Sequence, residues 1–256
     1  MRIVRSDLSH GHELEGVVVV VDVLRAFSTA AYAFAAGARK MVVAHSIAEI
    51  ETLRGRHVPN LTVGAQAGGR PIVGLDFGNS PAAVAPLNLS GMTVIEYTAG
   101  GVRGLIDCDH ASAVLAGSLV CARATADYIS QLRAERVTFV ITGLWTDRDG
   151  DEDHACADLI EAYLCGERPW LEDFERRVRL SDFGRRFGDP AHPHLPRLDL
   201  DLCAAADRFD FAMPMRRSGG DLLIEPVPVA GFAALAPDGA RIDDGRSADE
   251  SSPLIR

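Results

Sequence analysis

Residues 17–22 constrain the fold of this chain most, because five consecutive valines run directly into an aspartate. A strand that is apolar at every position is buried on both faces, as is usual in parallel sheets covered by helices on either side. Asp22 then stands where the strand leaves the sheet. Because ligands of open α/β sheets bind outside the carboxyl ends of strands, Asp22 is the first candidate for a functional residue.

The residues after Asp22 predict a helix that follows the strand closely. Ser28 is a capping residue, and Gly37 closes the predicted helix after Ala36. A carboxylate, the guanidinium of Arg25 and a helix N-terminus within seven residues suit a metal ion together with a phosphorylated substrate. The alternative is that Asp22 caps the turn and Arg25 pairs with it on the surface. This segment alone does not decide between the two.

Apolar strands alternate with helices along the first two-thirds of the chain. We expect strands over 39–44, 92–97, 113–116 and 137–141, and helices over 123–132 and 152–164. Such alternation predicts an α/β fold, a layered sheet with mostly parallel strands and flanking helices.

The pattern of apolar and charged residues changes after residue 166. A charged amphipathic helix, a second helix over 199–206 and two strands joined around 218–220 predict a smaller C-terminal α+β region. We therefore expect an α/β domain over 1–166 that carries the active site, and a smaller helical and β-hairpin region over 167–236 packed on it. The polar, glycine-rich residues 237–256 predict a mobile tail.

Composition excludes several classes of protein. With 256 residues and 47% hydrophobic content the chain can bury a substantial core, and its net charge of -10 argues against nucleic acid or an anionic membrane as partner. No run of 18 apolar residues and no signal-peptide core occur.

The five cysteines form no CxxC pair, which predicts reduced, mostly buried thiols in a cytoplasmic protein. One lysine among 26 basic residues suggests a GC-rich bacterial genome.

A second polar cluster lies in the segment GLDFGNSP, residues 74–81. Asp76 follows an apolar run, Gly78 lets the backbone turn, and Pro81 fits the first turn of a helix that Ser80 caps. An Asx turn leading into a capped helix explains Ser80 and Pro81, but it does not explain why Asp76 and Asn79 both stand at the end of a strand.

Two further segments follow predicted strands. Thr98 precedes a glycine pair, Gly100 and Gly101, where backbone N–H groups can point at a phosphate, although a plain tight turn is an equally simple explanation. Acidic residues crowd the start of the helix over 152–164, where the helix dipole favours carboxylates. Of these, Glu152 and Asp153 are the best candidates for facing a metal ion, because they begin the helix that follows a buried strand.

Taken together, these segments resemble the 2-phosphosulfolactate phosphatase family. The resemblance rests on DVLRAFST (22–29), GLDFGNSP (74–81), the turn at 98–101, AGS (116–118) and EDHACADLI (152–160), which follow one another in the family's order. It implies a magnesium-dependent hydrolase that removes phosphate from 2-phospho-3-sulfolactate during coenzyme M biosynthesis. It also implies an α/β fold distinct from those of the common phosphatases.

The resemblance also suggests roles for individual residues. We expect Asp22, Arg25 and Asp76 to be catalytic, with Mg²⁺ held by Asp22, Asp76, Glu152 and Asp153. Arg25 would clamp an acidic group of the substrate with its two-pronged guanidinium. The residues expected to complete the anion site are Ser28, Thr29, Asn79, Ser80, Thr98, Gly100, Gly101 and Ser118.

Three positions depart from the family pattern. The turn at 97–101 lacks an asparagine and a threonine, Gln66 replaces a glutamate, and Cys121 replaces an asparagine. These differences leave two alternatives open, a phosphatase with an altered substrate and a protein that binds a phosphorylated ligand without turnover. The expected partner is a small anionic phosphorylated molecule, with no nucleic acid and no membrane. The sequence is compatible with a homo-oligomer and does not decide between direct attack by water and an aspartyl-phosphate intermediate.

Overall fold

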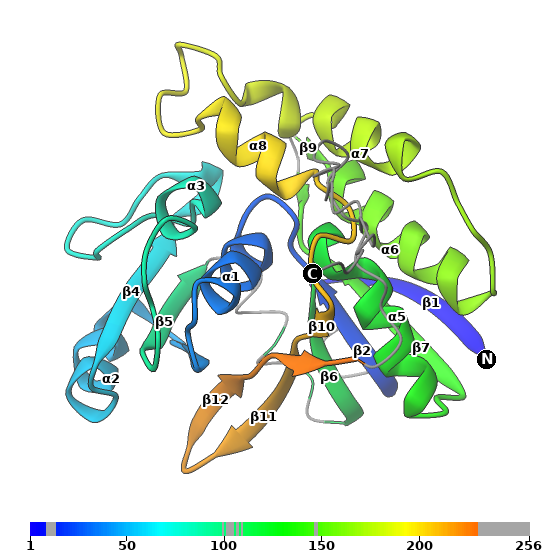
Figure 1. Ribbon diagram of the computed structural model, residues 1–256, viewed down its shortest axis with the longest axis horizontal. Coiled ribbons are helices and arrows are strands. Elements are labelled where there is room, and N and C mark those ends of the chain that lie inside the picture. The colour runs from blue at the N-terminus through cyan, green and yellow to red at the C-terminus, as the bar shows by residue number, and fades with distance from the viewer. Residues whose placement is uncertain are drawn as a thin grey trace, which may run out of the picture.

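The computed structural model describes residues 1–8, 14–98, 100, 105, 108, 110–145 and 148–229. These residues form a mixed α/β fold in which helices flank a large, mostly parallel sheet (Figure 1). The predicted fold class is therefore confirmed. The proposed tail over 237–256 lies outside the described residues.

The main sheet contains nine strands in the order β1-β7-β2-β6-β11-β12-β3-β5-β4. Strands β1, β7, β2 and β6 are mutually parallel, as are β3, β5 and β4. The strands are β1 (Arg2–Asp7), β2 (Gly16–Val21), β3 (Lys40–Val43), β4 (Asn60–Ala65), β5 (Thr93–Thr98), β6 (Ala111–Gly117), β7 (Arg136–Ile141), β11 (Pro214–Ser218) and β12 (Asp221–Ile224).

Strand β2 is buried on both faces, as its valine run predicts. Val18 and Val20 pack into one apolar cluster with Phe27 of helix α1, which spans Ala26–Ala35. Val17, Val19 and Val21 face the other side of the sheet, where helices α5 (Ala122–Gln131) and α6 (Asp151–Leu164) cover them. Because successive side chains of a strand point to opposite faces, one apolar run supports both layers.

The remaining helices extend these two layers. Helix α2 packs Ile50 and Leu53 against Val42 and Ile95 of the parallel strands β3 and β5. Helix α6 packs against α5 on one side and α7 on the other. These helices are α2 (Ile50–Arg56), α3 (Pro81–Val84), α7 (Leu171–Leu180) and α8 (Arg197–Cys203).

An antiparallel hairpin joins the two parallel parts of the sheet. Strands β11 and β12 pair with each other, β11 also pairs with β6, and β12 with β3. The predicted hairpin around 218–220 is therefore confirmed, and it is an integral part of the main sheet. In Figure 1, β2 rises from the lower right and β4 from the lower left, so their carboxyl ends approach the same region.

Four short strands form two further antiparallel pairs outside the main sheet. Strands β10 (Phe211–Ala212) and β13 (Val227–Pro228) form a separate antiparallel pair, as do β8 (Leu144–Trp145) and β9 (Arg148–Asp149).

All five cysteines are free thiols, as predicted, but Cys165 is exposed because it follows the last turn of α6 at the surface. The division into two domains stays a prediction.

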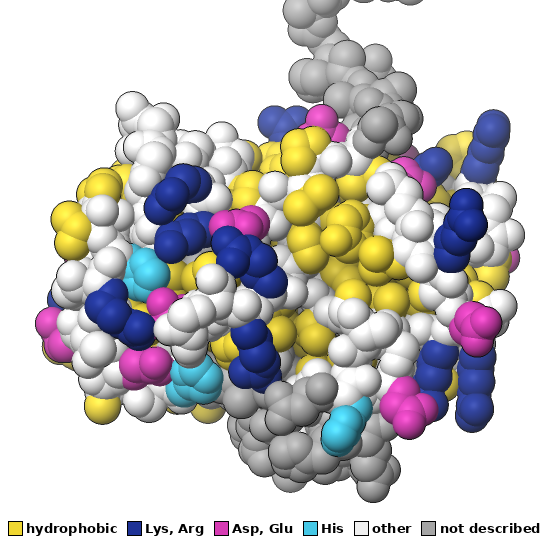
Figure 2. Space-filling view, turned by 90° about the horizontal axis from the view of Figure 1, so that it is seen from below, with side chains coloured by type: hydrophobic (Ala, Val, Ile, Leu, Met, Phe, Trp, Pro, Cys, Tyr) yellow, Lys and Arg dark blue, Asp and Glu magenta, His cyan; other side chains and the backbone are white. Residues whose placement is uncertain are grey.

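The face of the molecule seen from below carries apolar side chains at its centre, with basic and acidic side chains mixed around them (Figure 2). Among the described residues no helix is long and apolar enough to cross a membrane.

Candidate active site

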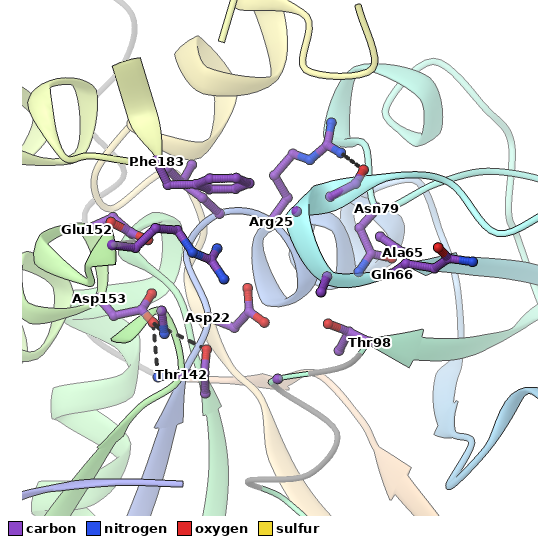
Figure 3. A pocket seen from close by; sticks show the side chains of 17 residues that line it. Asp22, Arg25, Ala65, Gln66, Asn79, Thr98, Thr142, Glu152, Asp153 and Phe183 are labelled. Atoms are coloured by element: carbon purple, nitrogen blue, oxygen red, sulfur yellow. Dashed lines mark hydrogen bonds between the residues drawn. The ribbon is translucent and has the colours of Figure 1, made fainter. Parts of the chain in front are cut away.

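A cavity lies where the carboxyl ends of two pairs of parallel strands meet, β2 with β7 and β4 with β5. Its walls come from residues that follow β2, β7, β4 and β5, together with the start of α6 (Figure 3). About 520 Å³ of space free of protein atoms lies within it, part of which is open solvent. The residues that line it are Asp22, Leu24, Arg25, Ala65, Gln66, Ala67, Gly68, Gly69, Asn79, Thr98, Gly100, Thr142, Gly143, Arg148, Glu152, Asp153 and Phe183.

Asp22 lines the cavity at the end of β2, as the sequence predicts. Its Oδ1 accepts a hydrogen bond of 3.0 Å from the N–H of Ala26 in the first turn of α1. The strand end and the helix start thus hold this carboxylate in place. Asp22 does cap the turn, and it also faces the cavity, so the two interpretations of this residue are compatible.

Asp153 lines the cavity too, but both of its oxygens are occupied by hydrogen-bond donors. Oδ1 accepts from the N–H of Val23 at 2.8 Å, and Oδ2 accepts from the N–H of Gly143 at 2.7 Å and from the N–H and hydroxyl of Thr142. This carboxylate joins the loops that follow β2 and β7. Its geometry favours a bracing role over the metal ligation that the sequence suggested.

Glu152 is the neighbouring acid, and its position is quite different. Its side chain is buried, and Oε2 has no hydrogen-bond partner. Burial raises the pKa of Glu152 to about 7, although a backbone hydrogen bond, a hydrogen bond with the Ser181 side chain and the charge of Arg148 oppose the shift. Gly143 permits this packing, because a Cβ there would lie 2.7 Å from Oε1 of Glu152. A carboxyl group that titrates near neutral pH is suited to proton transfer.

Glu96 is a further buried acid that the sequence did not single out. It lies on β5 two residues before Thr98, so both side chains leave the same face of the sheet. Its two carboxyl oxygens have no hydrogen-bond partner. Burial, together with the negative charge of Asp22, raises the pKa of Glu96 well above its ordinary value. Glu96 is therefore a buried acid close enough to Asp22 to be affected by its charge, although it is not among the residues that line the cavity.

Three of the residues expected at an anion site line the cavity wall opposite Glu152. Asn79 is buried and its Oδ1 has no hydrogen-bond partner, and Thr98 and Gly100 follow the end of β5 (Figure 3). These groups supply an amide, a hydroxyl and a backbone turn. Gly101 lies outside the described residues.

Arg25 borders the cavity, but its guanidinium is bound to the protein itself. One terminal nitrogen forms an ion pair with Asp199 of α8 and a 3.2 Å bond to the carbonyl of His194, and the other donates to the carbonyl of Gly69 at 2.9 Å. Figure 3 shows Arg25 pointing away from Asp22. Neither the expected clamp nor surface pairing with Asp22 describes this arrangement, because α8 supplies a buried partner.

Asp76 is not among the residues that line the cavity. Its Oδ2 accepts hydrogen bonds from the N–H of Thr62 at 2.8 Å and from the Thr62 hydroxyl at 2.6 Å. Partial burial works against ionisation, but the bonds from Thr62 and the charge of Arg54 outweigh it and lower the pKa of Asp76. Two polar residues of the motif GLDFGNSP therefore have different roles. Asp76 bonds its segment to β4, whereas Asn79 lines the cavity.

Four of the five hydroxyls expected to bind substrate have structural partners, namely those of Ser28, Thr29, Ser80 and Ser118. Ser28 lies inside α1 and does not cap it, because its Oγ donates to the carbonyl of Val23 and contacts Oγ of Ser118, each at 2.7 Å. Thr29 donates to the carbonyl of Arg25. Ser80 caps α3 and donates to Asp199 at 2.8 Å. None of the four lines the cavity, within the part of the chain that the structure describes.

The oxygen atoms in the cavity match the ligand preference of Mg²⁺. Asp22 and Glu152 supply carboxylates, Asn79 supplies an unpartnered amide oxygen, and Mg²⁺ prefers oxygen ligands. In the described residues no three acids, histidines or cysteines lie close enough to hold a metal ion by themselves.

Several cavity residues were missed by the sequence analysis. Thr142 and Gly143 follow the buried strand β7, which is the same signal that marked Asp22. Arg148 and Phe183 come from the short strand β9 and the residues after α7, where no periodic pattern points to a site. Asp199 lies on α8, and its role depends on tertiary packing with Arg25.

Comparison with known proteins identifies relatives over most of the chain. The family model described as 2-phosphosulpholactate phosphatase matches residues 3–185. A probable 2-phosphosulfolactate phosphatase of Gloeobacter violaceus is 36% identical over 225 residues, which cover 80% of this chain and 90% of the relative. A protein of the same description from Bacillus subtilis is 28% identical over 221 residues, covering 85% of this chain and 96% of the relative.

Proposed function

The chain belongs to the 2-phosphosulfolactate phosphatase family, a family of phosphoric monoester hydrolases, and we propose that it hydrolyses 2-phospho-3-sulfolactate to 3-sulfolactate and inorganic phosphate with the help of Mg²⁺. The observation that carries this proposal is the cavity in which Asp22, Glu152 and Asn79 meet at the carboxyl ends of the strands. Such an edge is where α/β sheets bind ligands.

The charge of the cavity supports the magnesium part of the proposal. Asp22 and Glu152 are buried acids, and a phosphate ester would be repelled by them if no cation stood between. Asp22 and Asn79 would hold the ion, together with water and the substrate phosphate. Bound Mg²⁺ neutralises phosphate oxygens and lowers the pKa of a coordinated water.

The chain's own residues would position the reacting groups. The N–H of Ala26 fixes one oxygen of Asp22. Asp153 holds the loops of residues 23 and 142–143 so that the walls keep their spacing. Glu152, whose pKa lies at about 7, is suited to take a proton from the attacking water. In this reaction the oxygen of water bonds to phosphorus, the ester P–O bond breaks, and the leaving oxygen takes up a proton.

The test is an assay of phosphate release by the full-length chain. We expect it to release inorganic phosphate from 2-phospho-3-sulfolactate, with activity lost on chelation and restored by Mg²⁺. A phosphate panel including phenyl phosphate serves as the comparison, because it reveals any altered preference. Release that is unaffected by chelation would contradict the magnesium proposal, and no release from any ester would contradict the phosphatase proposal.

A further inference from the structure

Asp199 of α8 does not line the cavity, but its carboxylate bonds to two segments of the chain that do. The side chain of Asp199 is fully buried. Its Oδ2 accepts from Arg25, which follows β2, and its Oδ1 accepts from the hydroxyl of Ser80 at 2.8 Å and from the N–H of Ala82 at 2.9 Å. Helix α8 also packs against α3 (Figure 1). One carboxylate thus joins the segment after β2 to the start of α3.

The bonds to Oδ1 of Asp199 fix the residues next to Asn79. Ser80 follows Asn79 directly and is the N-cap residue of α3. Asn79 is buried and lines the cavity, and its amide oxygen has no hydrogen-bond partner (Figure 3). A buried polar atom without a partner favours a ligand that supplies one. Asp199 therefore holds the backbone from which this oxygen reaches the cavity.

The bond to Oδ2 of Asp199 reaches a third segment through Arg25. The guanidinium also donates to the carbonyl of Gly69 at 2.9 Å and to that of His194 at 3.2 Å. Gly69 lines the cavity, and a Cβ there would lie only 3.3 Å from the guanidinium. Nε2 of His194 donates to the carbonyl of the neighbouring Gly68 at 3.1 Å. This glycine pair is therefore held by Arg25 and by the segment that leads into α8.

We propose that Asp199 is a positioning residue of the active site, which keeps the segments of Arg25, Gly69 and Asn79 in place around bound phosphate and Mg²⁺. This inference rests on the proposed function, because it takes Asn79 as a ligand of the ion. Asp199 lies outside residues 3–185, which the family model matches. The C-terminal region thus contributes to the site as well as to the fold.

The charge of Asp199 and its hydrogen bonds have opposite effects on anion binding. A negative charge repels an anion, so removing the charge alone would strengthen phosphate binding. Asparagine has one acceptor oxygen and carries N–H donors in place of the other. Asp199→Asn can therefore satisfy the Arg25 side or the Ser80 side, but not both. Weaker phosphate binding in this variant would report lost positioning, because the change in charge predicts the reverse.

Calorimetric titration with inorganic phosphate in the presence of Mg²⁺ tests the inference, on protein whose folding is checked by circular dichroism. We expect Asp199→Asn to weaken phosphate binding roughly 10- to 100-fold, the usual loss when a residue that orients metal ligands is replaced. Asp201→Asn is the matched control, because it removes the same charge from the same helix and breaks only partly exposed ion pairs with Arg179 and Arg197. It should change phosphate binding by less than about twofold.

A milder variant keeps the test decisive if Asp199→Asn does not fold. Ser80→Ala removes one donor to Oδ1 and leaves the ion pair between Asp199 and Arg25 intact, so we expect roughly threefold to tenfold weaker phosphate binding. Unchanged or tighter phosphate binding in Asp199→Asn, or in Ser80→Ala where that variant is used, would overturn the inference. Equal weakening in Asp201→Asn would overturn it as well.

Turnover separates this inference from the proposed function. In Asp199→Asn, kcat/KM for 2-phospho-3-sulfolactate should fall together with phosphate affinity, whereas Asp201→Asn should resemble the wild type. If the wild type hydrolyses no ester but its phosphate binding is weakened by Asp199→Asn, the phosphatase proposal alone is overturned. If the wild type is active and Asp199→Asn has the same kcat/KM and phosphate affinity, the role of Asp199 alone is overturned.

Discussion

Two groups of buried acids lie side by side in this protein and are satisfied in opposite ways. In the first, which we call the Asp199 cluster, Asp199 of α8 accepts from Arg25, from the hydroxyl of Ser80 and from the N–H of Ala82. The second group consists of Asp22 and Glu152, which line the cavity, and Glu96 on β5. Here both carboxyl oxygens of Glu96 and one oxygen of Glu152 have no hydrogen-bond partner.

The difference separates acids that maintain the fold from acids that await a ligand. Where a buried carboxylate is bonded to several donors and a cation, removing one of these partners strongly destabilises the folded protein, because a buried charge is then left uncompensated. A buried acid without partners destabilises the folded protein and favours a bound cation or proton. Burial alone does not distinguish the two groups, whereas the donors around each oxygen do.

The largest effect on stability is expected at the Asp199 cluster. Asp199→Asn leaves the buried charge of Arg25 without its counter-ion and should lower the free energy of unfolding by about 3 kcal/mol, measured by urea denaturation. Asp201→Asn on the same helix breaks a partly exposed ion pair with Arg179 and should lower it by less than about 1 kcal/mol. Equal effects of the two changes would remove the distinction.

The pH dependence of stability tests Glu152. Its folded pKa of about 7 lies above the ordinary value of 4.5, so the folded protein binds the proton more tightly than the unfolded chain. The resulting stabilisation is complete below pH 4.5 and is lost as the pH rises to about 7, a decrease of about 3 kcal/mol without Mg²⁺. Glu152→Gln should remove this part of the pH dependence in chemical denaturation. Identical pH profiles for variant and wild type would contradict the raised pKa.

Glu96 should show the opposite sign from Asp199 on substitution. Glu96→Leu replaces an acid without partners by an apolar side chain of similar volume, so it should raise the free energy of unfolding at pH 7 by about 2 kcal/mol. Thermal melting without Mg²⁺ measures the change. A lower melting temperature would mean that Glu96 has partners in solution and belongs with the paired acids.

The smallest effect is expected at Asp76. Its side chain is 47% exposed and its ion pair with Arg54 is long, at 3.8 Å, so Asp76→Asn should lower the free energy of unfolding by less than about 1 kcal/mol. Chemical denaturation at pH 7 measures it. A loss as large as that of Asp199→Asn would show that Asp76 shares the role of the buried, paired acids.

The sheet layers and one half of the site could be predicted from sequence. The valine run of β2 has one packing solution, burial on both faces, and Asp22 must follow it at the edge of the sheet. Glu152 was found for a similar reason, because it starts the helix that follows β7. Signals of this kind are local, since they depend only on a strand and its next turn.

The other half of the site depends on contacts between distant segments. Arg25 looked like a substrate clamp because the residue that pairs with it, Asp199, is 174 positions away. Asp76 looked like a metal ligand because its neighbour Thr62 lies on another strand. A polar residue at the end of a strand predicts the position of its side chain. It does not predict whether another residue of the chain is already bonded to that side chain.

The most direct test of the central claim compares the two strand-end aspartates, Asp22 and Asp76. Phosphate release from 2-phospho-3-sulfolactate would be measured with Mg²⁺ for Asp22→Asn and Asp76→Asn, each normalised to folded protein. Because Asp22 faces the cavity and Asp76 is bonded to Thr62, we expect Asp22→Asn to lose activity by about 100-fold or more and Asp76→Asn to stay within a few-fold of wild type. Loss of activity in Asp76→Asn with Asp22→Asn active would contradict the account.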